Sequence, residues 1–155
     1  MKIKKIIICL VVMLLLTGCG DKEVKLDLNK IETDVNGLKD DDGNLFADNE
    51  KLSMEKLQDK YGMDTSIFDE ILVSTPSKVG SASMYAIFLP NKDHKDECKK
   101  EIDKFFDKYS QAWTMGYFPE EEKLVKDKSE DKYGNYYIYV ISRDNDMVID
   151  KIKSE

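Results

Sequence analysis

The stretch DHKDECKKEIDKFFDKYSQAWTM, residues 93–115, decides the fold of this chain. Its apolar residues recur at spacings of three and four, the period of one helix face, while Lys, Asp and Glu fill the other positions. The apolar stripe comprises Cys98, Ile102, Phe105, Phe106, Tyr109, Ala112 and Trp113. We predict a long amphipathic helix that ends at Gly116. It should bury Phe105 and Phe106 against a sheet and place Cys98 at the edge of that core.

Three apolar runs predict the strands of this sheet. Residues 71–73 and 84–89 flank the turn-rich segment 74–81, so we expect them to be antiparallel neighbours. Gly134 and Asn135 predict a turn before residues 136–141, an aromatic and β-branched run that is typical of a strand.

Four shorter helices are expected around the sheet. Asp27, Ser53 and Asp144 are candidate N-caps, and Pro119 suits the first turn of a helix. Residues 40–44, DDDGN, should form a solvated loop after the first helix, and Gly62 should stop the second. The resulting order, α-α-β-β-α-α-β-α, groups the strands. We therefore predict one α+β domain over residues 27–155, with a small, mainly antiparallel sheet of about three strands packed against the long helix.

The N-terminus predicts export and a lipid anchor. Lysines at positions 2, 4 and 5 precede the apolar residues 6–16, which are too few for a membrane-spanning helix of about 20 residues. The run Leu16-Thr17-Gly18-Cys19 then matches a bacterial lipobox. We expect a signal peptide over residues 1–18, cleavage between Gly18 and Cys19, and diacylglycerol on the Cys19 thiol. Residues 19–26 would tether the domain to the extracytoplasmic face of the cell membrane.

Charge and cysteine content narrow the classes of function. Removal of residues 1–18 takes away three lysines and no acid, which changes the formal net charge from −7 to −10. Such an acidic domain is a poor ligand for nucleic acid, and anionic headgroups would repel it, so the lipid itself must hold it at the membrane. After processing, Cys98 is the remaining free thiol and no intrachain disulfide is expected. The Lys-, Asp- and Ile-rich composition favours a Gram-positive source.

Candidate catalytic and metal-binding groups have simpler interpretations. His94 and Cys98 share a helix face, but Cys98 lies on the apolar stripe, which favours a buried core residue beneath an exposed histidine. The acidic loop fails the EF-hand pattern, because Leu38 and Asn49 fall where ligands are needed. Residues 69–70 and 120–122 are the densest acidic clusters, and no pair of carboxylates is expected to face across a cleft with a raised pKa. We predict no catalytic residue, metal or cofactor.

Tyrosines offer a candidate binding surface. Tyr137 and Tyr139 fall on one face of their predicted strand, and Tyr85 is expected to align with them from a neighbouring strand. Such a platform would stack on sugars or grip a peptide. The alternative is a central strand with both faces buried.

Several motifs resemble one family of bacterial lipoproteins. They are Tyr61-Gly62-Met63-Asp64, the two strands around residues 71–73 and 86–88, Tyr117-Phe118-Pro119-Glu120, and Gly134-Asn135-Tyr136 leading to Ile141-Ser142. In this order they resemble the family described as domain of unknown function 4358. The resemblance implies a lipid-anchored envelope protein of Gram-positive type and supplies no catalytic residues.

Three functions are compatible with these observations. The first is a non-enzymatic envelope lipoprotein whose domain binds an envelope protein or a wall glycan. The second is a hydrolase that acts on wall material through carboxylates. The third is capture of a small solute or peptide, although one small domain lacks the two lobes of a hinged binding protein.

Overall fold

The structure, a computed structural model, describes residues 23–155. The predicted lipobox Leu16–Cys19 therefore lies outside the described residues. Among the helices of residues 23–155, none combines the length and the hydropathy of a membrane-spanning segment. The elements in chain order are α2 (Leu28–Asn36), β1 (Lys39–Asp40), β2 (Gly43–Asn44), β3 (Asn49–Lys51), α3 (Met54–Tyr61), the 3₁₀ helix η1 (Thr65–Ile67), β4 (Phe68–Pro76), β5 (Met84–Pro90), α4 (Lys95–Gln111), α5 (Pro119–Lys126), β6 (Ser129–Tyr133), β7 (Tyr136–Ile141) and α6 (Asn145–Lys153).

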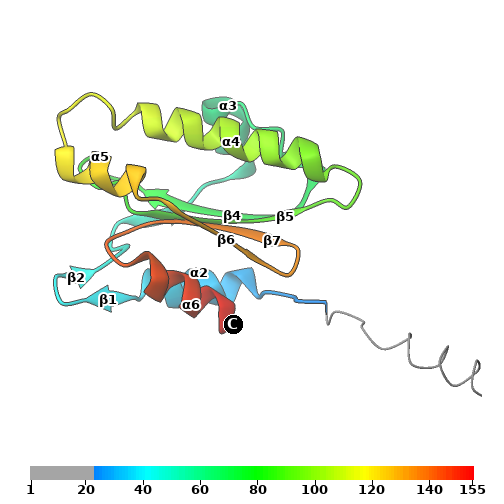
Figure 1. The fold of residues 1–155 in the computed structure, drawn as a ribbon, viewed down its shortest axis with the longest axis horizontal. Helices are drawn as coiled ribbons and strands as arrows, with labels where there is room; N and C mark the ends of the chain where they lie inside the picture. Colours follow the sequence, from blue (N-terminus) through cyan, green and yellow to red (C-terminus); the bar gives the residue numbers. More distant parts are fainter. Residues whose placement is uncertain (1–22) are drawn as a thin grey trace, which may run out of the picture.

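A five-stranded sheet lies between two helical layers. Its strand order is β3-β4-β5-β7-β6, and every neighbouring pair is antiparallel. Helices α3, α4 and α5 lie over one face, and α2 and α6 lie over the other (Figure 1). The mixed helix and strand content and the antiparallel pairing confirm the coarse prediction.

The predicted count of three strands was wrong. The structure adds β3 and β6 as the two edges of the main sheet, and β1 and β2 form a separate hairpin. That hairpin replaces the solvated loop expected at residues 40–44, because the Asp40 carboxylate accepts hydrogen bonds from the Asp42 amide (2.9 Å) and from Arg143 (2.9 Å). The element order therefore differs from the predicted one.

The predicted helix boundaries follow from capping groups. The Asp27, Ser53 and Asp144 side chains each accept a backbone N–H of the first helical turn. Gly62 ends α3 in the left-handed conformation with φ 66°. The long helix α4 is shorter than predicted at both ends, since His94 precedes its first turn and Ala112 follows its last.

The core has one part on each face of the sheet. On the α3/α4 face, Phe105, Phe106 and Cys98 pack on side chains of β4, β5 and β7, as predicted. On the other face, Ile31 and Val35 of α2 and three side chains of α6 cover the sheet. The central strands β5 and β7 are therefore buried on both faces.

Asp34 links α2 to α6 and predicts an acid-sensitive contact. Its carboxylate lies 3.0 Å from Lys151 Nζ and 3.1 Å from Lys30 Nζ, and Glu155 pairs with both lysines. Hydrogen bonds from Lys151 and Lys30 lower the pKa of Asp34 to about 2. A lowered pKa means that the contact stabilises the fold above the ordinary aspartate pKa and that the effect is lost as pH falls toward 2.

We therefore expect Asp34→Asn to flatten the dependence of stability on pH between about 4 and about 2. Urea unfolding at a series of pH values measures this, with Asp41→Asn in the exposed β1–β2 turn as the control. An equal acid-induced loss of stability in Asp34→Asn and the unsubstituted chain would contradict the assignment.

Candidate functional site

One end of the molecule carries a pocket that four separate segments build. It has a volume of about 390 Å³. We call it the distal pocket. Its walls come from the end of α3, the end of β4 with the following loop, the last turns of α4 and the residue before α5. The aromatic and basic residues that line it include Lys60, Tyr61, Lys108, Tyr109, Trp113 and Phe118.

Aromatic rings form the floor of the distal pocket. The ring centroids of Tyr109 and Trp113 lie 6.4 Å apart, and those of Trp113 and Phe118 lie 6.0 Å apart in an edge-to-face arrangement. The Tyr109 hydroxyl donates a 2.9 Å hydrogen bond to the Ala82 carbonyl, which ties α4 to the β4–β5 loop. Burial raises the pKa of Tyr109 above its usual range, so its hydroxyl stays protonated. The floor is therefore fixed and apolar.

Lysines stand at the rim of the distal pocket. Lys78 is paired with Asp48 at 2.6 Å, whereas Lys60 and Lys108 have no ion pair among residues 23–155. The Lys60 ammonium lies 5.1 Å from the centroid of the Tyr61 ring. Positive charge is thus concentrated beside an aromatic floor in a chain whose net charge is −7. This arrangement suits a ligand that combines an apolar group with a carboxylate or another anion.

Exposed apolar side chains lie in the distal pocket and beside it. Val79 in the β4–β5 loop is 90% exposed, and Met115, Tyr117 and Phe118, in the link from α4 to α5, are 75%, 79% and 41% exposed. These four are most of the large hydrophobic residues that are exposed within residues 23–155. Clustered exposed apolar groups beside polar ones mark interaction surfaces more often than single ones do.

A family model matches the part of the chain that contains the distal pocket. The family described as Domain of unknown function (DUF4358) matches residues 41–142, which is more than half of the chain. The chain belongs to this family. The DUF4358 region runs from the β1–β2 hairpin to the end of β7, so it contains the whole distal pocket but neither α2 nor α6. No curated protein and no solved structure matched the chain in the other two comparisons.

The predicted tyrosine platform is not present in the DUF4358 region. Tyr85 pairs with Val140 and Tyr139 pairs with Ala86, so Tyr85 and Tyr139 point to opposite faces of the sheet. Both side chains are fully buried, and only Tyr137 is partly exposed. The expectation of one exposed face is therefore wrong, and the alternative of a central strand buried on both faces is confirmed.

The buried tyrosine hydroxyls serve the fold. Tyr85 donates to the Asn36 side chain at 3.0 Å, which links β5 to the end of α2, and burial raises its pKa to about 12. Tyr139 lies within hydrogen-bond distance of Lys99 Nζ (3.0 Å) and Glu130 (3.3 Å). Burial likewise raises the pKa of Tyr139 to about 12. The Tyr139 ring therefore sits beneath a surface ion pair and cannot stack on a ligand.

His94 and Cys98 do not form a reactive pair. The Cys98 thiol is fully buried and lies 3.1 Å from the Ile67 carbonyl, to which it donates. Burial raises the pKa of this thiol, which suppresses the reactive thiolate. His94 is exposed at the start of α4, and its Nδ1 lies 3.7 Å from Glu97. The interpretation of Cys98 as a core residue beneath an exposed histidine is confirmed.

The acidic residues hold structural contacts. Glu70 accepts from the Tyr136 hydroxyl at 2.9 Å, Asp69 accepts from Asn91 at 3.1 Å, and Glu121 accepts from the Ala82 amide at 2.6 Å. The carboxyl pKa shifts that are resolved in residues 23–155 are all downward; they belong to Asp34, Asp64, Glu130, Asp131 and Glu155. In the same residues, no group of three or more His, Cys, Asp or Glu side chains is arranged to hold a metal ion.

Sequence reasoning missed the distal pocket because its residues come from four segments. The periodicity of residues 93–115 places Trp113 and Tyr109 on the core stripe and Lys108 on the polar face, and nothing in the sequence marks Lys60. A weak signal was present in Met115, Tyr117 and Phe118, which are large apolar residues between two helices. Only the tertiary arrangement brings this link next to Val79.

Proposed function

We propose that this chain is a membrane-anchored extracytoplasmic lipoprotein whose domain binds an envelope protein and catalyses no reaction. The anchor rests on Leu16-Thr17-Gly18-Cys19 and on the basic and apolar residues before it. The composition and the family resemblance favour a Gram-positive envelope. Metabolic labelling with a fatty-acid analogue tests the anchor.

One observation carries the binding function: the distal pocket lies at the end of the domain opposite the N-terminal segment. Val24 contacts the β6–β7 turn at Gly134, where an added Cβ would lie 2.7 Å from the Val24 Cβ. The link between α4 and α5 is at the other end of the sheet (Figure 1). A domain tethered through residues 19–26 would therefore present Tyr117 and Phe118 away from the membrane.

The chemistry of the distal pocket favours a protein over a glycan. Sugars stack on flat, exposed rings, whereas this surface mixes aromatic rings with the aliphatic side chains of Val79 and Met115. Interface cores are enriched in aromatic residues and Met. Lys60 and Lys108 add a preference for acidic residues, which would flank the apolar side chain that enters the pocket.

Site-specific photocrosslinking in native membranes tests the binding function. A benzophenone side chain at Tyr117 is expected to capture one protein of defined mass, and the same group at the exposed Asp41 is not. The double variant Lys60→Glu/Lys108→Glu should reduce the Tyr117 crosslink at least about tenfold, because two charges change sign at the rim. A matched pair, Lys92→Glu/Lys95→Glu at the start of α4, should leave it unchanged.

Two results would count against this function. One is a Tyr117 crosslink that is no stronger than the Asp41 crosslink. The other is a crosslink that survives charge reversal of Lys60 and Lys108 in a protein whose thermal unfolding is unaltered. Either result would remove the distal pocket as the binding surface.

A further inference from the structure

One edge of the main sheet is only partly covered. Strand β3 pairs with the end of β4, from Asn49 opposite Pro76 to Lys51 opposite Ser74, and the Leu52 amide then donates to the Val73 carbonyl at 2.8 Å. After that contact the chain leaves the sheet and enters α3. On its other side β4 pairs with β5 from Phe68 to Ser74, with a shift in register between Phe68 and Glu70. Residues 68–72 of β4 therefore have no strand beside them on the outer edge among residues 23–155.

The uncovered edge presents hydrogen-bonding groups. The N–H and C=O of one residue point to the same side of an antiparallel strand, and the side alternates from residue to residue. Since the Val73 carbonyl faces β3, the N–H and C=O of Ile71 face the uncovered edge. Five residues at about 3.3 Å each reach at most about 16 Å, and the irregularity between Phe68 and Glu70 shortens this span. This is the length of an ordinary short strand.

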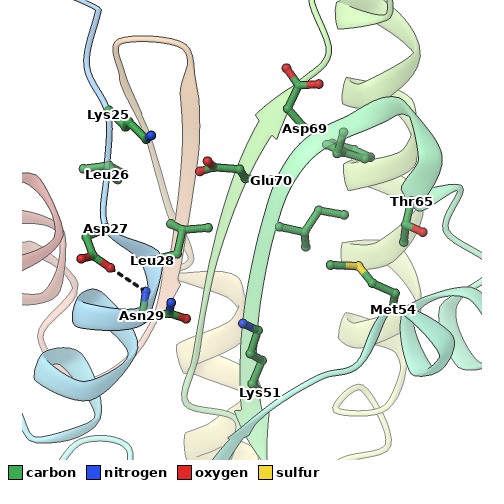
Figure 2. Close-up of a pocket in the computed structure, with 12 residues that line it drawn as sticks. Lys25, Leu26, Asp27, Leu28, Asn29, Lys51, Met54, Thr65, Asp69 and Glu70 are labelled. Atoms are coloured by element: carbon green, nitrogen blue, oxygen red, sulfur yellow. Dashed lines mark hydrogen bonds between the residues drawn. The ribbon is translucent and has the colours of Figure 1, made fainter.

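A groove runs along this edge between the two helical layers. Its volume is about 630 Å³, within the usual range for ligand sites. We call it the β4 groove. Residues 25–29 form one wall, and Met54 of α3 with Thr65 of η1 forms the other (Figure 2). Four residues of the uncovered edge, Phe68–Ile71, also line the groove, so the edge and the groove are one site.

The two walls differ in chemistry. Glu70, which accepts from the Tyr136 hydroxyl, points toward the wall of residues 25–29, where Asp27 and Lys25 lie (Figure 2). With Asp69, the three carboxylates of the β4 groove outnumber its two lysines, Lys25 and Lys51. On the opposite wall the Met54 side chain is 43% exposed and supplies an apolar contact surface. Because successive side chains of a strand point to opposite faces, the groove selects a segment that alternates apolar and basic residues.

We propose that the β4 groove binds an extended peptide by strand addition, with apolar side chains toward Met54 and basic side chains toward Glu70. Main-chain hydrogen bonds supply affinity in this mode, and alternate side chains supply specificity. A second copy of this chain fits less well. A two-fold pairing of residues 68–72 would place Glu70 opposite Glu70 of the other copy, and like charges directly opposite destabilise a sheet.

The test uses the full chain in detergent micelles and the acetylated peptide Val-Lys-Val-Lys-Val amide. Hydrogen exchange at the Ile71 amide should be fast in the free protein and at least about tenfold slower with saturating peptide. The same peptide with N-methyl groups on its central residues keeps its side chains but cannot pair, and it should give no protection. The peptide Val-Glu-Val-Glu-Val should bind at least about tenfold more weakly.

Matched protein variants locate the site. Met54→Lys should weaken binding at least about tenfold with unchanged thermal unfolding. Met115→Lys, in the link between α4 and α5, should leave binding unchanged. Equal binding of the N-methylated peptide, or binding without protection of Ile71, would overturn the proposal. Protection of Ile71 without peptide, together with a doubled mass, would replace the peptide with a second copy and also overturn it.

Discussion

Replacement of Phe105 with alanine is expected to remove about 3–5 kcal/mol of the free energy of unfolding. The Phe105 side chain is fully buried. Its ring centroid lies 4.5 Å from that of Tyr61, 5.0 Å from that of Phe106 and 6.1 Å from that of Tyr109. Truncation loses the transfer free energy of the ring and leaves a cavity where α3, α4 and the sheet meet.

Since small domains have a total stability of about 5–15 kcal/mol, this loss is a large part of it. Urea unfolding followed by circular dichroism measures the effect. We expect a midpoint well below that of the unsubstituted chain, with the slope unchanged. Tyr117→Ala is the matched control, because that ring is 79% exposed and its loss should change stability by about 0.5 kcal/mol or less. Similar midpoints for both variants would contradict the core placement of Phe105.

Replacement of Cys19 with serine is expected to abolish lipid attachment completely. The thiol is the nucleophile that would receive diacylglycerol, and a serine hydroxyl is not a substitute for it. Two acyl chains suffice for stable anchoring, so their loss removes the proposed anchor. Incorporation of a fatty-acid analogue should fall to background, and the mass of the protein should show that residues 1–18 are retained.

Two other cysteines provide the controls for this experiment. Cys9→Ala and Cys98→Ala should both keep the fatty-acid label, because neither residue follows a small residue at a cleavage-competent position. Label retained by Cys19→Ser would contradict the lipobox assignment. If Cys9→Ala lost the label, the substitution within the apolar residues 6–16 would itself have impaired export or lipid attachment.

The helices could be predicted because each has a local signal. The α4 stripe, the caps Asp27, Ser53 and Asp144, and Pro119 in the first turn of α5 act over one or two turns of chain. Strands β4, β5 and β7 were predicted as well, because each has an apolar run. The predicted residues 71–73 were too few for β4, which extends to Pro76 through residues expected to turn, because β3 pairs with that end. Strand β6, Ser-Glu-Asp-Lys-Tyr, lacks any apolar alternation. Residues 129–133 form a strand because they pair with β7, and this pairing is a tertiary contact that no local pattern in the sequence indicates.

The candidate sites were harder to predict from the sequence than the strands, because they depend on how distant segments pack together. Alternation along residues 136–141 correctly separated Tyr137 and Tyr139 from Tyr136, but it gave no register with Tyr85. A shift of one residue in pairing moves a side chain to the other face, which is what separates Tyr85 from Tyr139. The distal pocket and the β4 groove each join segments that are far apart in sequence, so no local pattern predicts them.

The charged residues of the edge strand β6 affect whether neighbouring copies of this chain can pair with one another. A lipid anchor would confine neighbours to two dimensions, where collisions are frequent and an exposed strand invites lateral clustering. The outer strand β6 carries Glu130, Asp131 and Lys132, and two of these charges are held in place: Glu130 lies 2.8 Å from Lys99, and Asp131 pairs with Lys153. A second β6 approaching this edge would have to desolvate those charges. Copies held side by side on one membrane would therefore not pair through β6.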